Sequence, residues 1–201
     1  MPQLSHARLA VSVRAARRFE HRAIRGVLRS AYQEYAQVLP PAAFGRYLKD
    51  ILDLGARAHA GRLLVAEHAG RIVGAVTFYD DAAAEGFGWP SGWAGVRALG
   101  VDPAVRGLGV GRTLLRACVE RAVAAGAGVL CLHTAEFMTA AVAMYEAAGF
   151  RRVPSYDFDA SEHPRLGGEP IAILAYRLDL PRPATTGRPR FANPTTVAAG
   201  R

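Results

Sequence analysis

The sequence predicts an α/β (α+β) fold, in which helices flank a single mixed, mostly antiparallel central sheet. Two β-rich apolar runs, 62–67 and 71–79, are separated by only three residues, which indicates an antiparallel hairpin. A third strand, 93–101, is followed by a glycine-rich turn and a helix, which indicates a crossover connection. Because hairpins and crossovers occur together, the sheet is expected to be mixed, and an all-parallel doubly wound sheet is not expected.

The N-terminal region predicts one short strand and two helices. Leu9, Val11 and Val13 alternate as in a half-buried strand. Residues 17–38 then place apolar side chains on one helical face and arginines on the other, and a second helix follows Pro41. The other expected elements are strands at 62–67, 71–79, 93–101, 129–134 and 171–180, a helix directly after the glycine-rich turn, and a short helix at 138–148.

Length and composition predict a single domain over residues 1–180. The chain has 201 residues, of which 51% are hydrophobic and 21% charged, as in an ordinary globular protein. Residues 181–201 are rich in Pro, Thr, Ala, Gly and Arg, so we expect a disordered tail there. No apolar stretch is long enough to span a bilayer, no secretory signal is expected, and two cysteines suit a reducing compartment, so a cytoplasmic location is expected.

The formal net charge of +8 is concentrated at the two ends of the chain. Residues 8–29 contain seven arginines and one glutamate, and residues 180–201 contain four arginines and no acid, whereas the remainder is nearly neutral. The solvated face of a helix accounts for the first cluster. No helix-turn-helix, zinc-finger or single-strand stacking pattern accompanies these arginines, so nucleic acid is not the expected partner.

The glycine-rich turn is the segment that points most clearly to a binding function. Gly107, Gly109 and Gly111 lack Cβ atoms, so successive backbone N–H groups can face one anion at the positive end of the following helix. A pyrophosphate fits this arrangement. The spacing matches neither the dinucleotide fingerprint nor the P-loop, because Arg112 and Leu114 occupy positions that those patterns reserve for other residues. A tight connection without function is the alternative.

Two motifs resemble those of the GNAT superfamily of N-acetyltransferases. Arg106, Gly109 and Gly111 match its acyl-CoA-binding motif, Gln/Arg-x-x-Gly-x-Gly/Ala. Residues 141–150 match its second signature, Ala-x-x-x-Tyr-Glu-x-x-Gly-Phe. The resemblance extends over approximately residues 6–180 and is strongest between 96 and 152.

This resemblance implies acetyl-CoA as co-substrate and no metal. It places the pyrophosphate on the N–H groups of 106–111 and the pantetheine arm beside 99–101, in a wedge where strands 93–101 and 129–134 splay apart. Backbone donors near 99–101 would polarise the thioester carbonyl. The implied cofactor-binding residues are Leu99, Gly100, Val101, Arg106, Gly107, Leu108, Gly109, Val110, Gly111, Arg112 and Thr113.

The resemblance also implies catalytic roles. Tyr145 matches the tyrosine that faces the CoA sulfur in this family, so it is the expected acid for the thiolate; a core tyrosine is the alternative. Many relatives carry a glutamate base on the strand before the turn, but residues 95–97 include no acid. His133 and Glu136 are the nearest replacements, although a packed histidine, a helix-terminal acid and a water chain are alternatives.

The expected acceptor is an amine of a small molecule or a peptide. Loops 80–92 and 155–170 combine aromatic and acidic residues, which suit a cationic amine. Members of the resembled family are often dimers, so the resemblance implies a homodimer. A catalytically inactive acyl-CoA-binding module is the competing hypothesis, because Met138 replaces an asparagine of many relatives and the strand glutamate is missing.

Overall fold

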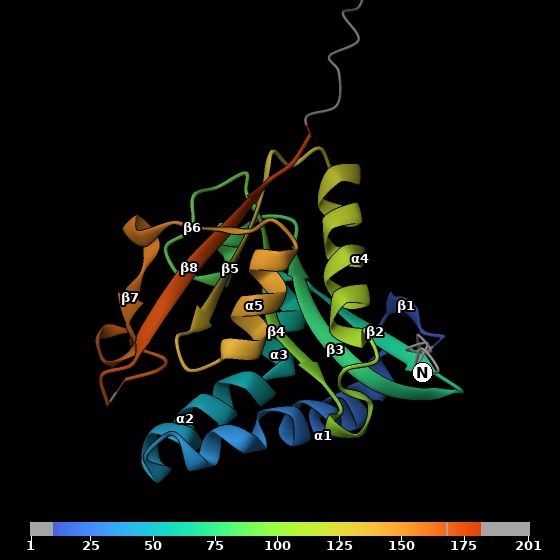
Figure 1. Cartoon of the computed structure of the whole chain (residues 1–201), viewed down its shortest axis with the longest axis horizontal. Helices are drawn as coiled ribbons and strands as arrows, with labels where there is room; N and C mark the ends of the chain where they lie inside the picture. Colours follow the sequence, from blue (N-terminus) through green and yellow to red (C-terminus); the bar gives the residue numbers. More distant parts are fainter. Residues whose placement is uncertain (1–9, 168, 182–201) are drawn as a thin grey trace, which may run out of the picture.

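The computed structural model describes residues 10–167 and 169–181, which form one twisted sheet with helices on both faces (Figure 1). The sheet order is β1-β2-β3-β4-β5-β8-β6, and β7 pairs with β8 outside this path. The strands are β1 (Ser12–Ala15), β2 (Arg62–His68), β3 (Arg71–Tyr79), β4 (Ala94–Val101), β5 (Val129–Ala135), β6 (Arg151–Arg152), β7 (Phe158–Asp159) and β8 (Ala172–Asp179). The helices are α1 (His21–Tyr32), α2 (Pro41–Leu52), α3 (Leu54–Ala60), α4 (Val110–Ala124) and α5 (Thr139–Ala147).

The predicted mixed, mostly antiparallel sheet is confirmed. Every strand pair is antiparallel except β4 with β5. The predicted hairpin joins β2 to β3 through Ala69 and Gly70, whose φ angles are 48° and 74°. Two consecutive positive φ values give a turn whose twist matches that of the flanking strands. The hairpin register pairs His68 with Arg71.

The alternation of side chains along the central strands creates two cores. Leu64 and Ala66 of β2 face the α4 side of the sheet, where they pack in one cluster with Leu114. Leu63 and Val65 face the opposite side and pack with residues of α1 such as Leu28. This period of two explains why one strand can support both helical layers.

The strands β4 and β5 separate after a short parallel stretch. They pair only from Ala94 to Val96, opposite 130–132. Beyond Val96, β4 continues along β3 and β5 continues along β8. A bulge in β4, with Ala98 at φ 51°, accompanies this divergence. The resulting opening is the splay that the resemblance implies.

Several local predictions need correction. The helix expected over 17–38 ends at Tyr32, and a 3₁₀ turn over Gln33–Gln37 follows it. The separate helix α3 was not predicted, although the Asp53 side chain caps it by accepting from the Ala56 N–H. The short strands β6 and β7 were not predicted either. The expected tail beyond Pro181 lies outside the described residues, among which no helix is long and apolar enough to cross a membrane.

Candidate active site

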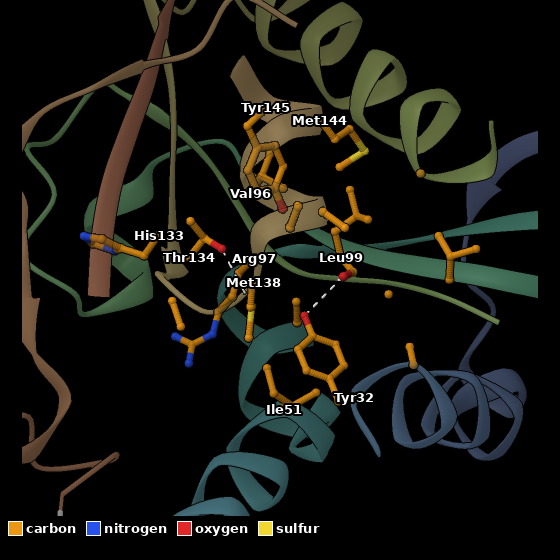
Figure 2. Close-up of a pocket in the computed structure, with 18 of the residues that line it drawn as sticks. Tyr32, Ile51, Val96, Arg97, Leu99, His133, Thr134, Met138, Met144 and Tyr145 are labelled. Atoms are coloured by element: carbon orange, nitrogen blue, oxygen red, sulfur yellow. Dashed lines mark hydrogen bonds between the residues drawn. The ribbon is translucent and has the colours of Figure 1, made fainter. Parts of the chain in front are cut away.

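A cavity of about 380 Å³ lies in the opening between β4 and β5. Its walls come from the end of α1, the splayed part of β4, the glycine-rich turn, the end of β5 and the inner face of α5 (Figure 2). Elements far apart in the sequence therefore meet around one space. The sheet geometry creates this space, because neither splayed edge has a strand partner across it.

The glycine-rich turn shapes one end of the cavity. Gly107 and Gly109 adopt φ angles of 78° and 88°, which L-residues with side chains rarely adopt. Gly109 is the N-cap of α4, a helix of 15 residues whose first N–H groups have no intrahelical partner. Gly111 lies close to α5, because a Cβ atom there would be 3.1 Å from the Met144 Sδ atom.

Two arginines flank this end of the cavity. Arg106 forms an ion pair with Glu34 at 2.8 Å and donates to the Ala31 carbonyl at 2.7 Å, so its side chain fastens the turn to the end of α1. Arg112 is exposed and has no salt-bridge partner within the described part of the chain. The turn therefore combines backbone donors, the positive end of a helix and one uncommitted guanidinium, which suits phosphate groups.

Most of the predicted cofactor-binding residues line the cavity. Those on its wall are Leu99, Gly100, Val101, Arg106, Gly107, Gly109, Val110, Gly111 and Arg112. Leu108 and Thr113 are not among the lining residues. The Thr113 hydroxyl instead donates to the Gly109 carbonyl at 3.1 Å, so its contribution is to the geometry of the turn.

Tyr145 projects from α5 into the same cavity (Figure 2). Its residue is 6% exposed, and burial raises the pKa of its phenol far above the ordinary value. No hydrogen bond joins the hydroxyl to another group of residues 10–167 and 169–181, and the oxygen is not among the fully enclosed polar atoms. The phenol is thus a neutral hydrogen-bond donor that is free to face a bound molecule.

The two predicted candidates for the base occupy different surroundings. His133 borders the cavity, but its ring stacks on Trp89 with centroids 4.2 Å apart, and its Nε2 atom lies 3.0 Å from the Tyr156 carbonyl oxygen. Burial lowers its pKa to about 4, so the imidazole is neutral and weakly basic. Glu136 is exposed and is absent from the cavity wall.

Both predicted acceptor loops reach the cavity. Loop 80–92 contributes Glu85 and Phe87, and loop 155–170 contributes Phe158 and Leu166. The aromatic side chains pack together, with the Phe87 and Phe158 centroids 5.7 Å apart. This half of the cavity is therefore mostly apolar and aromatic, with a small number of charged groups.

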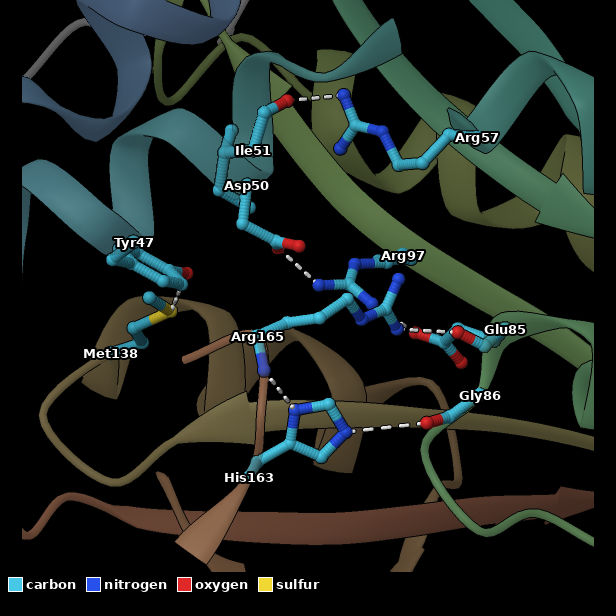
Figure 3. A network of polar contacts seen from close by, with 10 residues as sticks. All are labelled: Tyr47, Asp50, Ile51, Arg57, Glu85, Gly86, Arg97, Met138, His163 and Arg165. Atoms are coloured by element: carbon cyan, nitrogen blue, oxygen red, sulfur yellow. Dashed lines mark hydrogen bonds and ion pairs between the residues drawn. The ribbon is translucent and has the colours of Figure 1, made fainter. Parts of the chain in front are cut away.

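A buried ionic cluster in this half was not predicted. Arg97 of β4 contacts the carboxylates of Asp50 in α2 and Glu85, and its guanidinium lies 4.0 Å from the centre of the Phe87 ring (Figure 3). Asp50 and Arg97 are 47 positions apart, and no local sequence pattern signals such a contact. The sequence shows only that residues 95–97 include no acid, and that Arg97 is the charged residue in this part of β4.

The cavity is also bounded by Met138, which stands where many relatives of the resembled family have asparagine. Met138 is buried, and its Sδ atom is within weak hydrogen-bond distance of the hydroxyls of Tyr47 and Thr134, at 4.0 and 3.7 Å. It precedes α5 without a side-chain cap. No group of three or more metal-ligating side chains occurs among the residues that the structure describes.

The chain is similar to known proteins in both sequence and structure. The sequence profile of the Acetyltransferase (GNAT) family matches residues 24–150. Mycothiol acetyltransferase of Thermobispora bispora is 41% identical over 88 residues, which are 44% of this chain and 29% of that protein. IAA acetyltransferase of Azospirillum brasilense is 34% identical over 114 residues, which are 52% of this chain and 70% of that protein.

The fold is shared with solved structures. The yncA protein of Salmonella typhimurium, solved with its cofactor acetyl-CoA, has a TM-score of 0.59 and 19% identity, covering 87% of this chain and 96% of that chain. At this identity the likeness concerns the fold. The chain spans less than a third of the length of the mycothiol acetyltransferase that it matches.

Proposed function

Because the chain belongs to the acetyltransferase (GNAT) family, we propose that it transfers the acetyl group of acetyl-CoA to an amine by direct attack in a ternary complex. The observation that carries this proposal is the cavity between β4 and β5. At one end it meets the glycine-rich turn before α4, and from α5 it receives the Tyr145 side chain. Phosphate-binding groups and a proton donor thus border one continuous space.

The glycine-rich turn would hold the pyrophosphate. The N–H groups of Val110, Gly111 and Arg112 belong to the first turn of α4 and lack intrahelical partners. The exposed Arg112 guanidinium adds a positive charge beside them. Because Gly111 carries no side chain, its backbone is accessible from the cavity that it lines.

The splayed edge of β4 would align the cofactor arm. Acetyl-CoA supplies a thioester, whose carbonyl carbon is the electrophile. Residues 99–101 lie on the cavity wall and have no strand partner on the β5 side. The Tyr32 hydroxyl donates a hydrogen bond to the Leu99 carbonyl at 3.1 Å. This contact holds the edge of β4 in place without a bound ligand. The backbone N–H groups of this fixed edge would then be preorganised donors, which stabilise developing negative charge.

Tyr145 would donate the proton that the departing thiolate needs. The thiol that forms has a pKa of about 8.5, by analogy with cysteine, which is lower than that of the phenol. The transfer would therefore be coupled to loss of a proton from the new amide nitrogen, which returns the phenol to its neutral form. The phenol remains neutral because burial raises its pKa. Its hydroxyl is free of protein partners within the described residues, so it can face the sulfur.

The acceptor would be an amine of a small molecule or a peptide. The two relatives, mycothiol acetyltransferase and IAA acetyltransferase, are named after different acceptors. In this chain the aromatic side chains of Phe87 and Phe158, together with Glu85, border the cavity beyond the splayed strand. An amine carried by an apolar or aromatic group matches that lining.

A matrix of acyl-CoA thioesters and amines, assayed by release of free thiol, tests the proposal. We expect thiol release that depends on both the thioester and an amine, together with stabilisation of the protein against heat by acetyl-CoA. Heat stabilisation without thiol release for any amine would instead identify a catalytically inactive acyl-CoA-binding module. If acetyl-CoA gave neither thiol release nor heat stabilisation, the cavity would not be a cofactor site.

A further inference from the structure

The strongest unassigned feature of the cavity is the carboxylate of Glu85. The residue is only 5% exposed, yet it borders the cavity. Its Oε1 atom contacts the Arg97 guanidinium at 3.3 Å. Its Oε2 atom is fully enclosed, with the Trp89 side chain as the neighbouring donor and no hydrogen bond of normal geometry in the described part of the chain. A buried carboxylate with so few donors is costly to keep ionised, and uptake of a proton from a molecule in the cavity that Glu85 borders would relieve that cost.

We propose that Glu85 accepts the proton of the incoming acceptor ammonium, and that Arg97 and Asp50 position it for this role. The inference rests on the proposed function and deepens it by naming the group that makes the amine nucleophilic. Neither His133 nor Glu136 fits this role well, because the first is stacked and hydrogen-bonded through Nε2 and the second is exposed outside the cavity wall.

The arrangement around Arg97 leaves Glu85 able to take up a proton. Arg97 is shared, since Asp50 contacts one end of its guanidinium and Glu85 contacts another (Figure 3). Asp50 offsets the positive charge that would otherwise hold Glu85 in its ionised form. Protonation of Glu85 turns a buried cluster of two carboxylates and one cation into a neutral one. Consistent with this, burial raises the pKa of Glu85 to about 7.

Other groups also surround this cluster. Arg165 donates to the Glu85 backbone carbonyl at 2.5 Å, and Arg57 of α3 lies near Asp50 and Arg97 while donating to the Ile51 carbonyl. Both cations favour the ionised form of nearby acids, whereas burial and Asp50 oppose it. The groups facing Glu85 from the packed elements are Arg97 of β4, Asp50 of α2, Arg165 of the loop before β8, Tyr79 of β3 and Cys131 of β5.

The proton transfers balance as follows. An alkyl ammonium, with a pKa of about 10.4, gives one proton to the Glu85 carboxylate and becomes a neutral amine. Its nitrogen bonds to the thioester carbon, the C–S bond breaks, and the thiolate takes the proton of the Tyr145 phenol. The phenolate regains a proton as the new amide nitrogen loses one. Glu85 then releases its proton to solvent, so that one amide, one thiol and one proton leave.

The test compares two acceptors in the Glu85→Gln variant. One acceptor is an alkyl amine, which is protonated at neutral pH, and the other is a hydrazide of similar size, which is already neutral. We expect E85Q to lower kcat for the alkyl amine by about 100-fold and to leave the hydrazide reaction within about threefold of wild type. The control Glu120→Gln, on the exposed face of α4, should leave both reactions unchanged.

A second variant probes the position of the proton equilibrium. In Asp50→Asn, the positive charge of Arg97 is no longer offset by Asp50, so the ionised form of Glu85 is favoured. The acidic limb of the profile of kcat against pH should therefore move to lower pH. E85Q should lose that limb, and Glu85→Asp should keep it at a reduced rate. Equal losses with both acceptors in E85Q, or an unmoved acidic limb in D50N, would overturn this role for Glu85. Absence of thiol release in the wild type with every amine would overturn the proposed function itself.

Discussion

The Tyr32 hydroxyl donates a hydrogen bond to the Leu99 carbonyl at 3.1 Å (Figure 2). Tyr32 is the last residue of α1, and Leu99 directly follows the positive φ of Ala98 in the β4 bulge. The contact joins a helix on one face of the sheet to the point where the strand turns away from β5. It therefore holds the wall of the cavity in the shape that the proposed cofactor would need.

Removal of this hydroxyl should loosen that wall. In Tyr32→Phe we expect a loss of about 1 kcal/mol in the free energy of unfolding, because one hydrogen bond to a strand carbonyl disappears. The affinity for acetyl-CoA should fall as well, since Leu99 lies on the cavity wall. Urea titration and calorimetric titration measure the two effects. An unchanged affinity would show that the bulge holds its shape without Tyr32.

Tyr145→Phe should separate chemistry from binding. The ring and its packing on Phe150 remain, while the hydroxyl that faces the cavity is lost. We expect kcat to fall by about 100-fold or more with little change in the acetyl-CoA dissociation constant. The matched control is Tyr176→Phe, a buried tyrosine outside the cavity lining. If kcat of Tyr145→Phe equals that of the control, the phenol has no part in the reaction.

Gly109→Ala should impair the phosphate-binding turn through the backbone. Gly109 has φ 88°, and an alanine held in the left-handed region costs about 1–2 kcal/mol. Relief of that strain would move the N-terminus of α4, so both stability and acetyl-CoA affinity should decrease. Gly26→Ala provides the control, because a Cβ atom there meets nothing within 4 Å and α1 should gain about 0.5–1 kcal/mol. Stronger acetyl-CoA binding in Gly109→Ala would contradict this role of the turn.

Stability should depend on pH through His133. Burial lowers its folded-state pKa to about 4 from an ordinary 6.5, so between these values the unfolded chain binds the additional proton. The contribution of His133 to stability is therefore complete above pH 6.5 and is lost as the pH falls toward 4.

The matched comparison is His133→Gln, which keeps a side-chain donor for the Tyr156 carbonyl. Between pH 6.5 and 4, we expect the wild type to lose about 2 kcal/mol more stability than this variant. The difference between the two proteins cancels the titration of other groups, including the opposite contribution of Glu85. Parallel curves of melting temperature against pH would rule out a buried neutral imidazole.

Local patterns predicted much of the fold. Glycine marks the hairpin of β2 and β3 at Gly70 and the turn before α4 at Gly109. Both residues have a positive φ, which glycine adopts readily, so the sequence alone indicates a turn at each position. The end of α1 at Tyr32 was missed because apolar spacing continues through the 3₁₀ turn to Tyr35. Tertiary packing decides such a boundary more than periodicity does.

The site was predictable only where its residues are contiguous. The glycine-rich turn and the segment around Tyr145 carry motifs, and both border the cavity. The cluster of Asp50, Glu85 and Arg97 combines α2, a loop and β4, so its members come together only through the sheet topology. From the sequence alone, Arg97 is expected at the surface; in the fold it is buried between the carboxylates of Asp50 and Glu85.

The brief pairing of β4 with β5 has a mechanical consequence. Within the described part of the chain, only Ala94 to Val96 join the half-sheet of β1 to β4 to the half-sheet of β5 to β8. Beyond this seam no interstrand hydrogen bond of the described residues sets the width of the gap, so side-chain packing has to keep the two half-sheets at their separation.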